Sequence, residues 1–322
     1  MQVKYSKLIT VTALCAIILL VFLVSCAGSK KVSKSAFVFD TLITISIYDS
    51  DMSHNKKDSL IDDAIKICNE LDDKFSSTKE NSEIYLYNNN DNKLSKETLD
   101  LLDKTKYFTN LSGGLFDCSI GRLVKLWNVK ERKTIPQPYE INEAKDSSKK
   151  QLDFGAVIKG YACDKISSYF KAEGVESAVI NLGGNVTCIG GKSNVSGFSI
   201  GIEKPFSQNE VIKVLDIVDK SVVTSGIYQR YFIEEGDDKI YHHIIDPFTG
   251  YPTDNNLYSV SIVSNSSLLC DMLSTTLMLM NPSREDLIKI IKKINDDFDD
   301  DLTVIIVNNK YEVLEFNSKS TL

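Results

Sequence analysis

The sequence is poor in histidine, proline and tryptophan, with 3 His, 6 Pro and 1 Trp among its 322 residues. No two of the His and the 7 Cys stand at the CxxC or HxxxH spacing of zinc ligands, so a structural zinc site is disfavoured. A composition of 43% hydrophobic and 25% charged residues excludes collagen-like, low-complexity and disordered chains. A basic surplus is also missing, because the net charge is −7. This balance argues against a nucleic-acid partner, which would require a basic surface.

The N-terminus has the pattern of an exported lipoprotein. Lys4 and Lys7 precede an apolar run from residue 8 to residue 24, as in a signal peptide. The letters LVSC follow, ending at Cys26, and resemble a bacterial lipobox, in which this cysteine becomes the lipid-modified first residue. An uncleaved membrane anchor is the alternative, although the run is barely long enough. We expect residues 1–25 to be a signal peptide, residues 26–35 a flexible spacer, and residues 36–322 the folded domain.

The chain after the spacer mixes strand and helix patterns without a repeat or an internal linker, which favours one mixed α+β domain. Runs of β-branched and aromatic residues predict strands at 36–48, 177–182, 198–203, 211–218, 230–233 and 257–263, and a closing hairpin at 302–307 and 311–316. Apolar spacing predicts helices at 59–75, 96–111, 160–172, 267–280 and 284–294. Residues 130–150 are charged and are expected to form a surface excursion. The five cysteines after Cys26 are expected to be buried as small apolar side chains.

The letters LDFGAVIKGY at residues 152–161 open a predicted helix. Gly155 and Gly160 would let backbone approach a ligand, and Lys159 adds an ammonium group to the N–H groups of the first turn. Such a combination favours an anion. A tight strand-to-helix turn explains the same residues about as well.

Asp271 and Thr275 lie four residues apart on a predicted helix, so their oxygens project from one face. A carboxylate and a hydroxyl suit Mg²⁺, which prefers oxygen ligands and keeps further positions for water or phosphate. The alternative is structural, with Asp271 as a helix cap and Thr275 bonded back to a helix carbonyl.

The letters HHIIDPFTGYP at residues 242–252 contain two of the three His. Asp246 and Gly250 fit a turn, but a turn does not explain a histidine. His242 and His243 face opposite sides of an extended segment, so at most one of them points into a site. A neutral imidazole there could act as a base or orient a phosphate.

Other segments carry weaker signals. Thr224, Ser225 and Gly226 combine hydroxyls with a glycine, as in a phosphate or ribose cradle, and the missing GxSxG pattern disfavours a serine hydrolase. Gly183-Gly184 is not a dinucleotide-binding fingerprint. Trp127 is either a platform for a ring or part of the core. The segments around Glu83 and around Phe116 and Asp117 would each pass as ordinary loops.

Taken together and in order, seven segments resemble the ApbE family of bacterial FAD:protein FMN transferases over nearly all of residues 36–316: LDDKFSSTKENSEI, GGLFDCSIGRLVKLW, LDFGAVIKGYACD, INLGGN, TSGIYQRYF, HHIIDPFTGYP and CDMLSTTL. The resemblance implies a single mixed α/β domain of the ApbE type, related to the T-fold. It implies Mg²⁺-dependent transfer of FMN from FAD to a Thr hydroxyl of a partner flavoprotein, with release of AMP. The implied partners are redox subunits of the Na⁺-translocating NADH:quinone reductase and Rnf type, or extracellular electron-transfer flavoproteins. The implied location is the extracytoplasmic face of the bacterial membrane, anchored through a lipid such as palmitate on Cys26.

The resemblance also implies roles for individual residues. Asp271, the Thr275 hydroxyl and the backbone carbonyl of Ala156 would hold the metal, and His243 would help to deprotonate the acceptor Thr. Contacts to the flavin and adenosine of FAD would come from Glu83, Phe116, Asp117, Trp127, Lys159, Tyr161, Gly183, Gly184, Thr224, Ser225, Gly226 and Asp246.

The sequence departs from the family pattern at two places, the first of them near the expected flavin site. Phe39-Asp40 replaces the usual Met-Gly, and Cys118 replaces a usual Pro. Two other functions stay open at this stage: an FAD pyrophosphatase that yields FMN and AMP, and a tethered flavin-binding or solute-binding lipoprotein without turnover.

Overall fold

The computed structural model describes residues 31–320, apart from residues 91, 147, 149, 193–195, 208 and 237. The predicted signal peptide and Cys26 lie outside the described residues. Among the helices of the described part, none has the length and apolar character that crossing a bilayer requires.

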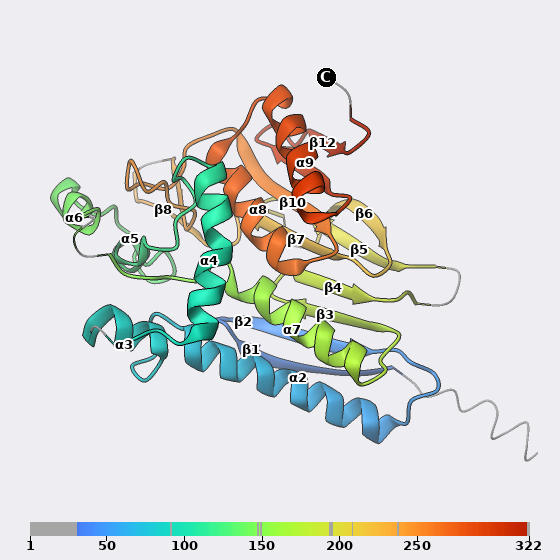
Figure 1. The fold of residues 1–322 in the computed structure, drawn as a ribbon. Helices are drawn as coiled ribbons and strands as arrows, with labels where there is room; N and C mark the ends of the chain where they lie inside the picture. Colours follow the sequence, from blue (N-terminus) through green and yellow to red (C-terminus); the bar gives the residue numbers. More distant parts are fainter. Residues whose placement is uncertain are drawn as a thin grey trace, which may run out of the picture.

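The centre of the fold is an eight-stranded antiparallel sheet (Figure 1). Its strands, in spatial order, are β1 (Val32–Val38), β2 (Thr41–Ile47), β3 (Ala178–Leu182), β4 (Asn185–Ile189), β7 (Ser221–Gly226), β10 (Leu257–Ser264), β11 (Thr303–Asn308) and β12 (Val313–Asn317). The two middle strands, β4 and β7, pair over only two residue pairs. The sheet therefore brings residues from both halves of the sequence side by side.

Helices cover one face of this sheet, and a small two-stranded sheet covers part of the other (Figure 1). Alternation along the strands separates the two cores: Val223 and Ile262 face the helices, whereas their neighbours Val222 and Val263 face the small sheet. The covering helices are α2 (His54–Phe75), α4 (Lys96–Leu111), α7 (Ile158–Ala172), α8 (Ser267–Met280) and α9 (Arg284–Phe298). The small sheet pairs β5 (Phe198–Glu203) with β6 (Val211–Ile217).

A third cluster of buried residues lies at one end of the sheet, around Trp127. It is built by α5 (Gly121–Trp127), α6 (Pro138–Ala144) and the hairpin of β8 (Tyr231–Ile233) and β9 (Ile240–His242). The short helix α3 (Glu83–Asn90) packs against α2.

Most predicted elements are present, and the mixed α+β fold is confirmed. Helix α8 has the predicted bounds, and α7 begins two residues earlier than predicted. The five described cysteines are buried and free, as expected. Helices α3, α5 and α6 and strands β4, β7 and β9 were not predicted, and α6 lies inside the segment that was expected to be an irregular excursion.

The prediction for residues 26–48 is wrong in two respects. The expected single strand is a hairpin, because Phe39 and Asp40 adopt positive φ values of 54° and 58° and reverse the chain. Residues 32–35 belong to β1 instead of a spacer. Val32 is buried on the helical side, and Lys34 forms ion pairs with Asp58 and Asp62 of α2, so this segment is held by both pairing and packing.

Candidate active site

The candidate site is centred on α8, which is buried along most of its length. From Ser267 to Met278 every side chain is buried apart from that of Thr275. The hydroxyl of Ser266 and the carboxylate of Asp164 bind the N–H groups at the start of the helix. Asp271 is therefore not the cap of its own helix.

The first turn of α7 lies directly on α8 at Gly160. A Cβ atom on Gly160 would stand 2.5 Å from the carbonyl oxygen of Ser267 and 2.8 Å from the Cβ of Asp271, so only glycine fits. The backbone N–H of Gly160 donates to Oδ2 of Asp271 at 2.9 Å instead of to the carbonyl of Ala156, four residues earlier. Gly160 thus serves helix contact, not the ligand approach that the sequence suggested. The Ala156 carbonyl keeps its acceptor capacity.

Lys159 is the cation of the site. Its Nζ lies 3.9 Å from Oδ1 of Asp271, and the two side chains are 19% and 4% exposed. Burial raises the pKa of the Asp271 carboxyl, and this is opposed by the Lys159 ammonium, the Gly160 N–H and the Asn185 side chain. A distance of 3.9 Å is long for a charge-assisted hydrogen bond. The buried carboxylate is therefore only partly compensated by the chain itself.

Asn185, at the start of β4, adds a donor to this site that has only a weak contact with the Asp271 carboxylate. Its side chain is 1% exposed and lies beside the Asp271 carboxylate. Among the described residues, none accepts a well-formed hydrogen bond from its Nδ2 atom. Buried amide groups without a partner cost free energy, so this donor marks a place where a ligand oxygen would be stabilised.

Three hydroxyl groups join α8 to β7. The Ser225 Oγ lies 2.8 Å from Oγ of Ser274 and 3.0 Å from Oγ1 of Thr275. The Ser274 hydroxyl donates to the backbone carbonyl of Asp271 at 3.1 Å. Thr275 is therefore bonded to β7, and not back to its own helix.

His242 and His243 face opposite sides, as predicted. His242 is buried and binds the Thr253 carbonyl through Nε2 at 2.9 Å. His243 is half-buried, with Nδ1 3.3 Å from the Arg230 carbonyl. Burial lowers the pKa of His243 to about 3, and the charges of Arg230 and Lys159 act in the same direction. His243, Lys159 and Asp271 are thus within electrostatic reach of one another.

The residues of this site fit a hard cation. No group of three or more His, Cys, Asp or Glu among the described residues could hold a metal ion. A metal here would depend on the Asp271 carboxylate, the Thr275 hydroxyl and the Ala156 carbonyl, which are all oxygen donors of the kind that Mg²⁺ accepts. The under-compensated charge of Asp271 supports this assignment.

Part of the predicted ligand-binding set lies around the ends of β3, β4 and β7. Gly183 and Gly184 form the β3–β4 turn with φ values of 60° and 95°, and Gly183 packs against Thr41 so closely that a side chain would clash. Thr224 points to the opposite sheet face from Ser225, and its hydroxyl pairs with that of Ser261 at 2.7 Å. These residues therefore lie at the end of the sheet where the β1–β2 and β3–β4 turns meet.

Four other residues that were expected to contact FAD make contacts within the protein instead. The Trp127 ring is fully buried, stacks on Tyr241 and donates to the Gly250 carbonyl, so it is a core residue and not an exposed platform. Phe116 is 2% exposed and packs against Phe108. The carboxylates of Asp117 and Asp246 bind backbone N–H groups of their own loops.

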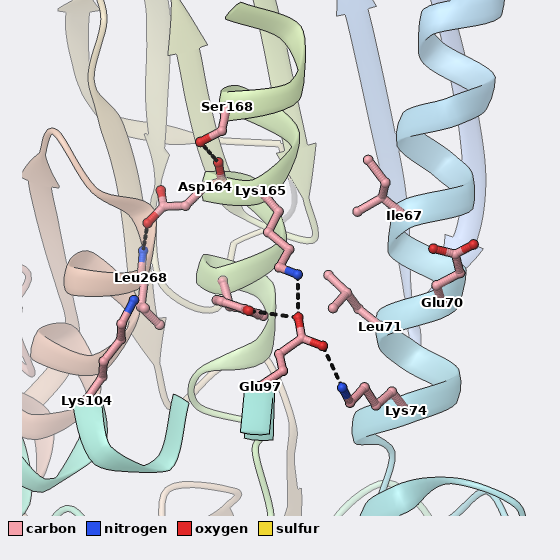
Figure 2. Close-up of a pocket in the computed structure, with 11 residues that line it drawn as sticks. Ile67, Glu70, Leu71, Lys74, Glu97, Lys104, Asp164, Lys165, Ser168 and Leu268 are labelled. Atoms are coloured by element: carbon pink, nitrogen blue, oxygen red, sulfur yellow. Dashed lines mark hydrogen bonds and ion pairs between the residues drawn. The ribbon is translucent and has the colours of Figure 1, made fainter. Parts of the chain in front are cut away.

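Tyr161 and Glu83 lie on the far side of α7 from Asp271. The Tyr161 hydroxyl donates to Glu97 at 2.9 Å, and Glu83 binds the backbone N–H of Ser95. Tyr161 and Glu97 line a groove of about 630 Å³ between α2, α4, α7 and α8 (Figure 2). Burial would raise the pKa of Glu97, but hydrogen bonds from Lys165, Lys74 and Tyr161 outweigh it and lower this pKa to about 2. Because Glu97 is already satisfied, it offers no unmet group to a ligand.

Two residues of the site were missed from the sequence. Asn185 ends the letters INLGGN, and Ser274 stands inside CDMLSTTL. Only their positions opposite Asp271 and Ser225 reveal them, since an Asn after a turn and a Ser in a helix carry no signal of their own.

A model of the ApbE family matches residues 39–298. The chain belongs to the ApbE family. A FAD:protein FMN transferase of Klebsiella pneumoniae is 38% identical over 205 residues, which are 57% of this chain and 62% of that relative. One from Treponema pallidum is 28% identical over 297 residues, which cover 80% of this chain and 81% of the relative. The crystal structure of an ApbE protein from Thermotoga maritima matches with a TM-score of 0.75 at 26% identity, covering 88% of this chain and 96% of that chain. The ApbE resemblance of the sequence is thereby confirmed.

Proposed function

We propose that this ApbE-family chain is a FAD:protein FMN transferase that uses Mg²⁺ to move FMN from FAD to a Thr hydroxyl of a partner flavoprotein and releases AMP. The proposal is supported above all by the buried and only partly compensated Asp271 carboxylate, which lies one helical turn from Thr275 on α8 and accepts a hydrogen bond from Gly160, four residues after Ala156. The Klebsiella and Treponema relatives, both FAD:protein FMN transferases, agree with it.

Asp271, Thr275 and Ala156 would hold the cation. When bound, Mg²⁺ would neutralise negative charge on the pyrophosphate, which is the main obstacle to attack on a phosphorus atom. Lys159 contributes a second positive charge from the first turn of α7, where backbone N–H groups also favour anions. These local charges allow an acidic protein to bind a polyanion.

His243 is the proposed proton acceptor. The Arg230 carbonyl can only accept, so the nearby Nδ1 carries the proton and the lone pair of Nε2 stays free. In the reaction, the Thr oxygen bonds to the flavin-side phosphorus, the bond to the oxygen that leaves with AMP breaks, and the Thr proton passes to Nε2 of His243. A pKa of about 3 makes this imidazole a weak base in the free enzyme. The negative charge of bound FAD would raise that pKa toward a useful range.

We also propose that a lipid such as palmitate on Cys26 tethers the domain to the extracytoplasmic face of the membrane. The lipobox-like letters LVSC support this, and the direction of β1 is compatible with it. Val32 begins β1 at the end of the sheet away from the Phe39-Asp40 turn, so the chain enters the domain opposite the candidate site (Figure 1). Labelling of cells with a palmitate analogue should mark the wild type and spare Cys26→Ser, whereas labelling of both would contradict the assignment.

The test of the activity uses the purified domain with FAD, Mg²⁺ and a flavoprotein that bears a candidate acceptor Thr. We expect fluorescent, covalently labelled acceptor on a denaturing gel, and its loss with EDTA or with Asp271→Ala. FMN and AMP formation that ignores the acceptor would instead identify a pyrophosphatase. Binding of FAD without any AMP release would identify a carrier. Full transfer by Asp271→Ala would refute the metal assignment.

A further inference from the structure

We propose that Ser225 and Ser274 are positioning residues that fix the direction of the Thr275 hydroxyl proton, so that the oxygen of Thr275 presents its lone pairs to the cation. The inference rests on the metal site of the proposed function. It concerns two side chains that hold the ligand from behind and are not ligands themselves.

The geometry is a chain of three contacts that ends on a backbone carbonyl. Oγ1 of Thr275 lies 3.0 Å from Oγ of Ser225, and this oxygen lies 2.8 Å from Oγ of Ser274. Oγ of Ser274 lies 3.1 Å from the carbonyl oxygen of Asp271. Ser274 is fully buried and Ser225 is 8% exposed, so solvent does not compete freely for these hydroxyls.

The directions of the three hydrogen bonds follow from counting protons. Each hydroxyl has one proton, and the Asp271 carbonyl has none to give. Three contacts must therefore be filled by three protons, and only one arrangement fills all of them. Thr275 donates to Ser225, Ser225 donates to Ser274, and Ser274 donates to the carbonyl of Asp271. Any reversal would leave two oxygens facing each other without a proton between them.

These hydrogen bonds fix the orientation of the Thr275 hydroxyl. Because its proton is donated to Ser225, the Thr275 oxygen has only lone pairs to offer on its other side. A neutral hydroxyl can ligate a cation only in this orientation. Residues behind a metal ligand often orient it in this way, and their removal commonly weakens metal binding about 10- to 100-fold.

The two serines should have distinguishable effects. In Ser225→Ala the Thr275 hydroxyl loses its acceptor and can turn its proton toward the cation. In Ser274→Ala the Ser225 hydroxyl loses its own acceptor and can donate to Thr275, which occupies a lone pair. Ser274 makes no side-chain contact with Thr275, and it touches Asp271 at the backbone carbonyl and not at the carboxylate proposed to bind the metal. An effect of Ser274→Ala on the Thr275 hydroxyl would therefore be transmitted through Ser225.

Ser221→Ala is the matched control. Ser221 lies on the same strand, is fully buried, and forms a hydroxyl pair with Thr187 at 2.9 Å. Its removal deletes a similar buried hydrogen bond without touching the chain that ends at Thr275. Ser225→Thr keeps the hydroxyl and should restore binding.

The experiment measures the dissociation constant of Mn²⁺ by electron paramagnetic resonance in the presence of FAD, with unfolding temperatures recorded in EDTA. We expect Ser225→Ala to bind Mn²⁺ about 10-fold more weakly than the wild type and Ser274→Ala at least about threefold more weakly. Ser221→Ala and Ser225→Thr should stay within about twofold of the wild type.

Wild-type Mn²⁺ affinity in both Ser225→Ala and Ser274→Ala would overturn the proposal, and so would an equal loss in Ser221→Ala. If Ser225→Ala does not fold, Ser274→Ala decides alone. A wild type that binds Mn²⁺ and loses it on Thr275→Ala, but not on either serine variant, would refute the hydroxyl chain and leave the proposed function intact. A wild type without Mn²⁺ affinity would refute the metal site itself.

Discussion

The backbone N–H of Gly160 donates a 2.9 Å hydrogen bond to Oδ2 of Asp271, and the missing side chain of Gly160 is what lets the two helices come this close. Helix α7 thereby gives one of its first-turn donors to a carboxylate on α8. The same contact frees the Ala156 carbonyl and places Lys159 beside the carboxylate. Helix packing and the proposed metal site therefore depend on one residue without a side chain.

Gly160→Ala should destabilise the protein although alanine favours helix formation by about 1 kcal/mol. The added Cβ would stand 2.5 Å from a backbone oxygen, so α7 and α8 must separate, and overpacking of this kind costs about 1–3 kcal/mol. We expect a lower urea midpoint and weaker Mg²⁺ binding. Ser168→Ala, on the exposed side of α7, is the control and should leave both unchanged. An unchanged urea midpoint in Gly160→Ala would show that the contact is not as close as described.

Asn185→Leu should have little effect on the unfolding temperature of the free protein but should reduce the stabilisation by FAD and Mg²⁺. The variant removes a buried donor whose contact with the Asp271 carboxylate is weak, so the unfolding temperature without ligand should fall only slightly. The increase in unfolding temperature on adding FAD with Mg²⁺ should shrink to less than about half, because the ligand oxygen loses its donor. A large loss of stability without ligand, with a normal response to FAD, would mean that Asn185 is only structural.

His243→Gln should slow transfer by about 100-fold or more while changing FAD affinity by no more than about twofold. Its pKa of about 3 keeps the imidazole neutral in the free enzyme from pH 5 upward. The pH profile of kcat/KM should therefore show no inflection from His243 between pH 5 and 8. His54→Gln, at the exposed start of α2, is the control. Unchanged turnover of His243→Gln at saturating FAD would remove this residue from the chemistry.

His242 should make the fold sensitive to acid. Burial lowers its pKa to about 4 from an ordinary value near 6.5, so the neutral form is the one that fits the fold. Its contribution is complete above pH 6.5 and is lost as the pH falls toward 4, by about 2 kcal/mol at pH 5. His242→Gln does not titrate, so its urea stability should fall less between pH 8 and 5 than that of the wild type. Parallel pH curves for the two proteins would contradict this assignment.

Sequence reasoning predicted elements well where one signal dominated. The spacing of apolar residues predicted the bounds of α8, and the extended HHIID segment predicted that His242 and His243 have different partners, which are the carbonyls of Thr253 and Arg230. It failed at the β1–β2 hairpin because Phe39 is a bulky residue that rarely adopts positive φ and therefore hides the turn that it forms with Asp40. The helices missed around Trp127 are short, and their stability comes from the cluster they enclose.

The sequence indicated which residues belong to the site, but it did not indicate which contacts their side chains make. Tyr161 and Lys159 are two residues apart on α7, and only the packing of α7 against both α8 and α4 separates the side toward Asp271 from the side toward Glu97. Ser225 was expected to touch FAD, but in the structure its hydroxyl binds Thr275 and Ser274 on α8. Contacts of this kind depend on tertiary structure, which a single sequence does not display.

Mass spectrometry of an acceptor flavoprotein, after incubation with this protein, FAD and Mg²⁺, tests directly whether FMN is transferred to a Thr hydroxyl. We expect one FMN joined through its phosphate to a Thr of the acceptor, with one AMP released for each FMN attached. A Thr→Val acceptor, or Asp271→Ala in place of the wild type, should give no product. Release of AMP and free FMN with an unmodified acceptor, in a reaction where a known FMN transferase modifies the same acceptor, would contradict this expectation.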